Sequence, residues 1–239
     1  MSRGEASAAI RVVTWNIHGG VGADRRCDLD RVATVIASLA PDILALQEVD
    51  GRAWAGRRPG AFERLAALLG GHVAEARLTG RGEGAYGHLL WSRWPLGEVA
   101  VRRLPGGRIE PRAVIDAVAE TPLGRLRVLA THFGLAPGDR KRQSAFLAAL
   151  PAERELPTVA LGDFNDWRRN GSVARFLGAA LPNVASLPTW PARRPFVPMD
   201  RIYASAGIPL APVSIDLTLE ARARRSSDHL PLAAMLALR

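Results

Sequence analysis

The sequence predicts an α/β (α+β) fold in which helices cover the outside of two mixed β-sheets. Short runs of apolar and β-branched residues alternate with stretches whose apolar residues recur at helical spacing. About ten strand-like runs are expected, against two helical stretches early in the chain and one in its middle. Some successive strands are joined by hairpin turns, which pair strands antiparallel. Helices outside two sheets therefore explain the pattern better than a parallel βα repeat.

Two amphipathic helices are expected in the first seventy residues. The first covers 29–39, because Asp28 can cap its first turn, its apolar residues share one face, and Pro41 follows its end. The second covers 62–69 and is ended by the two glycines at 70–71. Apolar runs predict buried strands on either side of the first helix, over 11–16 and 43–47.

The rest of the chain is expected to be mainly strand. Residues 112–120 and 125–131 form a predicted hairpin, because the sequence Thr-Pro-Leu-Gly at 121–124 favours a turn. The other expected elements are helices over 140–150 and 172–177, a proline-rich loop over 181–198, and strands over 89–91, 96–104, 158–161, 201–204, 213–219 and 231–238. The strands over 89–91 and 96–104 are expected to bend around Pro95.

The composition excludes several classes of protein. Of the 239 residues, 48% are hydrophobic and 23% charged, a balance typical of globular proteins and not of disordered ones. No run of about 18 apolar residues lacks both charge and proline, so no transmembrane helix is expected. Cys27 is the only cysteine, which rules out an intramolecular disulfide and favours a cytoplasmic protein. No linker or repeat divides the chain, so we expect a tail over 1–9 and one domain over 10–239.

The net charge is strongly positive, at +9. A basic protein can bind a polyanion such as nucleic acid or an anionic lipid surface. However, 31 of the 32 basic residues are arginine and only Lys141 is lysine, as a GC-rich coding sequence would produce for any partner. The charge is therefore compatible with a phosphate-bearing substrate without establishing one.

Polar residues that can carry chemistry stand at the ends of apolar strands. In each case a carboxylate, amide or imidazole ends a run that would otherwise belong to the core, and burying such a group without a partner is costly. The strand ends are therefore expected to meet at one edge, where these groups bind one another, a metal ion and a ligand. The segments are 14–18, 46–49, 130–133, 161–165, 199–203 and 226–231.

The residue types in these segments limit the metal ion. They offer carboxylate and amide oxygens, which favour Mg²⁺ or Mn²⁺, and no cysteine cluster that would favour a structural zinc. Asp163 and Asn165 are two positions apart, so both side chains point to the same side of an extended segment. Asp228 and His229 are adjacent and diverge, so the carboxylate can face a metal while the imidazole faces the reacting phosphorus.

This set of groups suits phosphoester hydrolysis. The reaction needs a cation to neutralise the non-bridging oxygens, a base to deprotonate water, and donors for the developing charge. A histidine can be the base because its ordinary pKa, about 6.5, is close to working pH. Asp200 is the candidate carboxylate to fix the tautomer of His229.

Taken together, the six segments resemble the endonuclease/exonuclease/phosphatase superfamily, which includes deoxyribonuclease I. They follow the family's order from Val13 to Pro231, nearly the whole chain. The resemblance implies a four-layer sandwich of two mixed sheets packed face to face, helices outside, and an active site at one edge. It makes the domain over 10–239 a catalytic one.

The same resemblance assigns roles to individual residues. Glu48 matches the principal metal ligand, and Asn16 and Asp228 match further residues of a Mg²⁺ or Mn²⁺ site. Asp163 and Asn165 match the Gly-Asp-Phe-Asn motif that orients the attacking water and binds phosphate.

Three more residues complete the implied catalytic set. His229 matches the general base or phosphate-contacting histidine, and Asp200 the carboxylate paired with it. His132 follows Thr131, as in deoxyribonuclease I-like and sphingomyelinase-like members, whereas abasic-site endonucleases carry a tyrosine-bearing motif there. Arg112 matches a phosphate-contacting arginine and Trp190 an aromatic residue of the substrate loop.

The resemblance implies a metal-dependent phosphodiesterase with a phosphate-containing substrate. We also expect the protein to be a monomer. Nuclease action on nucleic acid is the first hypothesis, because a basic groove suits a polyanion. A sphingomyelinase-like phospholipid phosphodiesterase and a small-molecule phosphatase are the alternatives within the family. A phosphate-binding module without turnover is the alternative of another class. The residues assign no role to His18 or His88.

Overall fold

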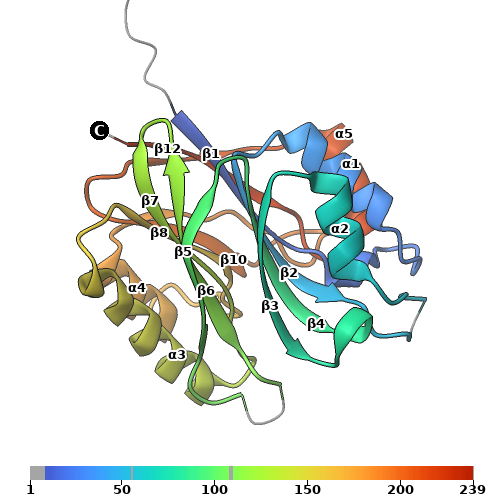
Figure 1. Ribbon diagram of the computed structural model, residues 1–239, viewed down its shortest axis with the longest axis horizontal. Helices are drawn as coiled ribbons and strands as arrows, with labels where there is room; N and C mark the ends of the chain where they lie inside the picture. Colours follow the sequence, from blue (N-terminus) through green and yellow to red (C-terminus); the bar gives the residue numbers. More distant parts are fainter. Residues whose placement is uncertain (1–8, 55, 108–109, 239) are drawn as a thin grey trace, which may run out of the picture.

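The computed structural model describes residues 9–54, 56–107 and 110–238 (Figure 1). These residues form two six-stranded mixed sheets packed face to face, with helices on both outer sides, as predicted. The predicted tail over residues 1–9 lies outside the described residues except for Ala9, where the first strand begins. No helix in the described ranges is both long enough and apolar enough to cross a membrane.

The two sheets share one pattern of strand directions. Each has one parallel pair near its centre, β1 with β2 and β7 with β8, and antiparallel pairs elsewhere. The first sheet has the order β11 (Leu210–Val213), β12 (Leu232–Ala237), β1 (Ala9–Asn16), β2 (Ile43–Asp50), β4 (Tyr86–Ser92), β3 (His72–Thr79). The second has the order β5 (Leu96–Arg103), β6 (Ala113–Thr121), β7 (Gly124–His132), β8 (Thr158–Asp163), β10 (Asp200–Ala204), β9 (Asn183–Ala185).

Helices cover the outer face of each sheet through apolar contacts. The first sheet packs under α1 (Leu29–Leu39), α2 (Ala61–Leu69) and α5 (Leu217–Ser226). The second packs under α3 (Pro137–Ala149) and α4 (Ser172–Ala180). Asp28 caps α1 as predicted, since its carboxylate accepts a hydrogen bond from the Arg31 N–H.

The space between the sheets changes from apolar to polar along the strands. Because side chains alternate across a strand, every second residue of each strand faces this space. At one end these residues are aliphatic, such as Val12, Ala45 and Leu161, and fully buried. Toward the other end the same faces present buried polar residues, namely Thr14, Asn16, Gln47, His88, His132, Asp163 and Asp200. The site therefore occupies the polar end of the molecule's central core.

Two expectations for the strands are wrong. The predicted strand over 213–219 is the end of β11 followed by the start of α5. The alternating apolar residues there imitate a strand, but the Asp216 side chain accepts a hydrogen bond from the Leu219 N–H and begins a helix. The predicted strands around Pro95 are not one bent element, because β4 and β5 belong to different sheets.

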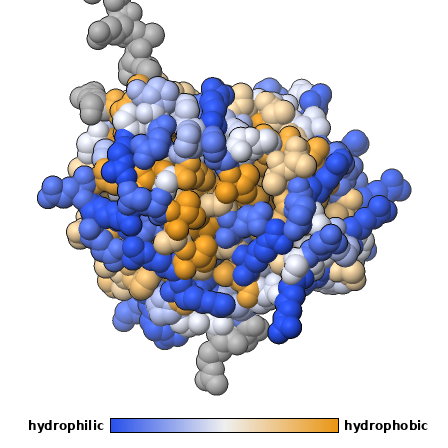
Figure 2. All heavy atoms as spheres, viewed as in Figure 1, coloured by the Kyte–Doolittle hydropathy of each residue, from blue (hydrophilic) through white to orange (hydrophobic). Residues whose placement is uncertain are grey.

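The edge strand β3 was not predicted from the sequence. It contacts β5, the edge strand of the other sheet. Over these two strands, apolar residues gather on one face of the molecule and are framed by hydrophilic ones (Figure 2). Val99 and Val101 of β5 are exposed. The short β9 likewise lies inside the segment predicted as a loop over 181–198.

Close packing of β7 against β8 supports the site, and a glycine permits it. A Cβ at Gly162 would lie 2.0 Å from the carbonyl oxygen of Thr131 on β7. Gly162→Ala should push the strands apart beside Asp163 and lower the free energy of unfolding by about 2–3 kcal/mol. Gly178 in α4 has no described atom within 4 Å of an added Cβ. Gly178→Ala should instead raise the free energy of unfolding by about 0.5–1 kcal/mol.

Urea denaturation of both variants measures the two effects. A Gly162→Ala protein as stable as the wild type would contradict the close approach of the two strands.

Candidate active site

A cavity of about 440 Å³ opens at the polar end of the space between the sheets. Residues from both sheets line it, and they include most of those predicted from the sequence. The predicted residues in its wall are Asn16, Glu48, Arg112, His132, Asp163, Asn165, Trp190 and His229. Asp200, which is buried, and Asp228, which is half exposed, each bind a residue of this wall. The fold thus brings all ten predicted site residues together.

A β-bulge aims Glu48 at the cavity. The pairing of β2 with β4 skips Glu48, since Gln47 pairs with His88 and Val49 with Gly87. Glu48 has a φ of +56°, in the left-handed region that glutamate seldom adopts. A bulge re-aims a side chain that strict alternation would send to the other face. Here it keeps the glutamate carboxylate on the cavity side while the strand continues.

Backbone strain is concentrated around this cavity. Among the described residues, six that are not glycine have positive φ, and three of them, His18, Glu48 and Asn165, line it. Asn165 is held by the Asp163 carboxylate, which accepts a hydrogen bond from its backbone N–H at 2.9 Å. Its side-chain Nδ2 donates to the Phe133 carbonyl at 2.9 Å. Strain of this kind is typical of sites where geometry matters more than local stability.

Asn16 connects the two sheets at the site. Its Nδ2 donates to Glu48 Oε1 at 2.8 Å and to Asp163 Oδ2 at 3.0 Å. Its Oδ1 accepts a hydrogen bond from the His18 N–H at 3.0 Å. Asn16 and Glu48 belong to the first sheet and Asp163 to the second. One buried amide therefore fixes two carboxylates relative to each other.

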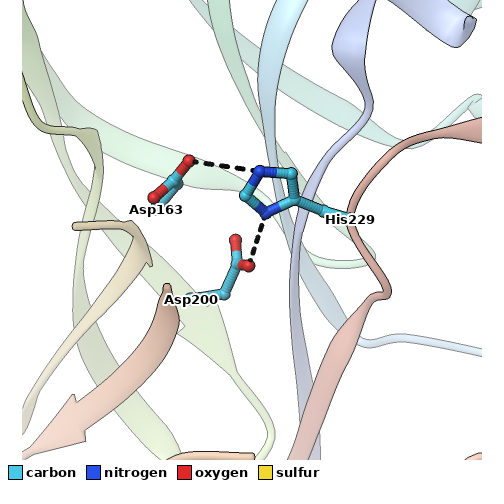
Figure 3. Close-up of side chains that lie close together, drawn as sticks. All are labelled: Asp163, Asp200 and His229. Atoms are coloured by element: carbon cyan, nitrogen blue, oxygen red, sulfur yellow. Dashed lines mark hydrogen bonds and ion pairs between the residues drawn. The ribbon is translucent and has the colours of Figure 1, made fainter. Parts of the chain in front are cut away.

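His229 lies between two carboxylates (Figure 3). Its Nδ1 donates to Asp200 Oδ2 at 2.9 Å, and its Nε2 lies 3.8 Å from Asp163 Oδ2. Burial by itself lowers the pKa of His229, but the charge and hydrogen bond of Asp200, with the charges of Asp163 and Asp228, raise it to about 10. In the metal-free protein this imidazole is therefore protonated at neutral pH. Burial likewise raises the pKa of Asp163, and the Asp200 charge adds to that effect.

Possible ligand atoms of Asp163, Asp200 and His229 all lie within 4.8 Å of one another, a spacing that a metal ion could use. We interpret the group instead as a histidine shared by two carboxylates. Both ring nitrogens already face an oxygen, and a metal ligand needs a neutral nitrogen. We therefore expect other oxygen donors, and not this group, to bind the metal ion.

His132 is in the opposite charge state. It is buried, and burial, together with the nearby positive charges of Arg112, His88 and His229, holds its pKa well below the usual value. The Nη1 of Arg112 donates to His132 Nδ1 at 3.0 Å, so the proton of this neutral ring is on Nε2. That nitrogen lies 3.7 Å from Asp163 Oδ2, at the cavity wall. The site thus holds one neutral and one cationic imidazole.

A second group of oxygen donors is suited to a divalent cation. Burial raises the pKa of Glu48, and the charges of Asp163 and Asp228 raise it further. Asp228 is half exposed, with Oδ1 3.5 Å from His18 Nδ1 and Oδ2 accepting from Trp190 Nε1 at 3.4 Å. Carboxylates that repel one another at a partly buried site are stabilised by a hard cation. The donor set therefore fits Mg²⁺ or Mn²⁺.

Several residues in the cavity wall were not predicted from the sequence. Arg52 and Arg57 lie on either side of Asp50, with Nε atoms 2.8 and 3.0 Å from its carboxylate. Their guanidinium groups stack on Tyr86 and Trp54, at 4.2 and 4.7 Å from the ring centroids. The feature of the sequence that could have indicated them is their position shortly after β2, the strand that carries Glu48. His18 lines the cavity, whereas His88 is buried behind it.

The charge of His229 can be tested without substrate. Because its pKa is raised in the folded protein, its pairing with Asp200 stabilises the fold fully below the ordinary histidine pKa of about 6.5. That contribution is lost as the pH rises through about 10. In EDTA, the free energy of unfolding should fall between about pH 7 and about pH 10 by at least ~1 kcal/mol more than for His229→Gln. Parallel stability profiles of the two proteins would show that His229 is not held protonated.

Comparisons with known proteins agree with this geometry. The sequence model of the Endonuclease/Exonuclease/phosphatase family matches residues 13–229. The uncharacterised protein YbhP of Escherichia coli K12 is 29% identical over 250 residues, covering 96% of this chain and 97% of its own length.

Solved structures show the same fold. The endonuclease/exonuclease/phosphatase from Beutenbergia cavernae superimposes with a TM-score of 0.70 at 26% identity, over 96% of this chain and 72% of that one. The human Nocturnin catalytic domain superimposes with a TM-score of 0.72 at 19% identity, over 97% and 95% of the two chains. At 19% identity, the second likeness concerns the fold alone.

Proposed function

The chain belongs to the endonuclease/exonuclease/phosphatase family, whose members are phosphoester hydrolases, and we propose that it cleaves phosphodiesters with Mg²⁺ or Mn²⁺ in a nuclease-like reaction. One observation carries this proposal. Asp163 lies between a neutral His132 and a cationic His229, and Asn16 holds it next to Glu48. One cavity therefore contains a base, a hydrogen-bond donor, a positive charge and a carboxylate suited to binding a metal ion.

Glu48 and Asp228 would hold the cation, whose charge neutralises a non-bridging phosphate oxygen when it is bound. Asn16 supports this site by orienting the Glu48 carboxylate through Nδ2. Since its Oδ1 already accepts a hydrogen bond from His18, its part in the metal site is mainly to position Glu48.

Asp163 is the residue that we assign to the attacking water. A carboxylate here can accept the proton of a water that attacks phosphorus in line with the leaving oxygen. Protonated His229, kept oriented by Asp200, then stabilises the negative charge that develops on the phosphate. Of the two roles that the resemblance leaves open for His229, its raised pKa favours the cationic one over that of general base.

The remaining wall residues would bind the substrate. His132 can donate its Nε2–H to a non-bridging oxygen, and Asn165 can donate the second hydrogen of its Nδ2, since the first is bonded to the Phe133 carbonyl. Arg112 and Arg52 lie in the same wall and can contact the phosphate, and each also pairs with a carboxylate, Glu110 at 2.7 Å and Asp50 at 2.8 Å. The net charge of the chain, +9, is our reason for preferring a nucleic acid, which carries many phosphates, to a small phosphoester.

We further propose that the protein works in the cytoplasm and as a monomer. Its single cysteine, Cys27, supports the first point, because the fold does not depend on an intramolecular disulfide. The second is supported by the site itself, since all its proposed residues come from one chain.

Turnover of a panel of substrates tests the proposal. Plasmid DNA, a single-stranded oligonucleotide, dispersed phospholipid and bis(p-nitrophenyl) phosphate are offered with Mg²⁺, Mn²⁺ or EDTA. Glu48→Gln and His229→Gln should each lower turnover by at least about 100-fold while the circular dichroism spectrum stays native. The matched control is Asp30→Asn, which changes an exposed carboxylate of α1 that pairs with Arg64. Full turnover by Glu48→Ala in excess EDTA would refute the assignment.

Metal binding can be measured apart from activity. If Glu48 is a ligand, Mg²⁺ or Mn²⁺ at about 100 times its dissociation constant should stabilise the fold by ~2.7 kcal/mol. For a chain of this length that corresponds to a rise of about 5–10 °C in Tm. Glu48→Gln should lose most of this rise and Asp30→Asn should keep it. An equal rise in wild type and Glu48→Gln would place the metal elsewhere.

A further inference from the structure

A second cavity, of about 820 Å³, adjoins the first one and shares Trp190 and Met199 with it. Its wall is formed mainly by aromatic side chains and arginines. We call it the aromatic groove and define it by Trp167, Arg169, Trp190, Phe196, Met199 and Arg201. None of the roles derived above requires this groove.

The backbone holds the groove in a fixed position relative to the catalytic residues. Trp167 and Arg169 lie on the loop between β8 and α4, directly after the segment that carries Asp163 and Asn165. Within this loop the buried Asp166 carboxylate pairs with Arg168 at 2.9 Å.

The opposite wall is tied to His229 by the backbone. Trp190 and Val197 pair across the loop before β10, where the Val197 N–H donates to the Trp190 carbonyl at 2.9 Å. In the same loop the Thr189 carbonyl accepts a hydrogen bond from the Leu230 N–H at 2.9 Å. Trp190 itself donates to Asp228. A ligand in the groove would therefore extend directly from a phosphate in the catalytic cavity.

The aromatic walls are open to a ligand. Trp167 is 52% exposed and Phe196 is 70% exposed, which is unusual for such large apolar residues next to a polar cavity. Ligand rings that stack on these faces would remove them from water. Every nucleic-acid base has such a face, so stacking platforms of this kind bind single strands with little sequence preference.

The arginines of the groove require an anion. Arg201 is only 5% exposed, and among the described residues its side chain makes one hydrogen bond, to the Tyr203 hydroxyl at 3.2 Å. In the ranges that the structure describes, no carboxylate lies within 4.0 Å of the guanidinium of Arg201 or Arg169, and no acidic residue lines the groove. A buried charge is costly unless a counter-ion neutralises it. An acyl chain would cover the aromatic residues but would leave Arg201 unpaired.

We propose that the aromatic groove binds the nucleotide next to the scissile phosphate of a single-stranded nucleic acid. Its base stacks on Trp167 and Phe196, and its own phosphate pairs with Arg169 and Arg201. In a duplex, neighbouring base pairs cover the faces of each base, so a duplex cannot fill the groove in the same way. This inference rests on the proposed function, because the adjoining phosphate is the one that is cleaved.

Two exposed residues provide the variants, Trp167→Ala and Arg169→Ala. Their controls are Val101→Ala and Arg103→Ala on β5, the edge strand on the far side of the second sheet from β10. The controls remove the same kinds of exposed group at a distance from the groove. The substrates are a short single-stranded oligonucleotide and bis(p-nitrophenyl) phosphate, which has no nucleobase and no second phosphate to pair with Arg169 and Arg201.

The groove variants should lower kcat/KM for the oligonucleotide at least about tenfold more than kcat/KM for the small diester. The controls should not change this ratio. In EDTA, where no cleavage is expected, the dissociation constant of the oligonucleotide should rise at least about tenfold in Trp167→Ala. A duplex of the same sequence should bind the wild type at least about tenfold more weakly.

The outcomes separate the two levels of the proposal. Equal losses on both substrates, with the small diester still cleaved by the wild type, would overturn the groove and leave the proposed function standing. Equal binding of duplex and single strand would also overturn it. A blue shift of the tryptophan emission with phosphatidylcholine vesicles that is lost in Trp167→Ala, with no change of emission on adding the oligonucleotide, would assign the groove to lipid instead. No turnover of either substrate by the wild type would overturn the proposed function and this inference with it.

Discussion

The site depends on the alternation of side chains in the strands that enclose the central space. The strands begin as aliphatic walls and become polar on the same face at one end, so the core of the sandwich continues directly into the cavity. Asn16 closes this end by binding Glu48 of one sheet and Asp163 of the other. Because the donors are buried and their bonds are short, the two carboxylates cannot shift independently, as catalysis by preorganised charges requires.

The two imidazoles of the site show how environment divides the chemistry among similar groups. His229 has a carboxylate at each ring nitrogen and is held cationic, whereas His132 faces Arg112 and is held neutral. The two rings lie on either side of Asp163. His132 offers it a hydrogen-bond donor and His229 a positive charge. Such divergence of neighbouring pKa values marks acid and base roles in enzyme sites generally.

Much of the site could be predicted from the sequence, because polar residues at the ends of buried apolar strands need polar partners and are therefore expected to meet at one edge. Asp163, Asp200 and His229 were found in this way, and the structure brings them together. The start of α5 is predicted as strand, since apolar residues alternate from Val213 to Leu219 on both sides of the helix cap at Asp216. The aromatic groove could not be predicted, because it unites residues such as Trp167 and Arg201 that only the tertiary fold brings together.

The position of the bound metal ion is the most direct test of the proposed reaction. Anomalous diffraction from crystals soaked in Mn²⁺ would locate the ion directly. We predict a peak within about 2.5 Å of the Glu48 carboxylate, on the side of Asp228. A peak enclosed by Asp163, Asp200 and His229 would contradict the account, because it would mean that His229 is a neutral ligand and not the cation on which the proposed reaction relies.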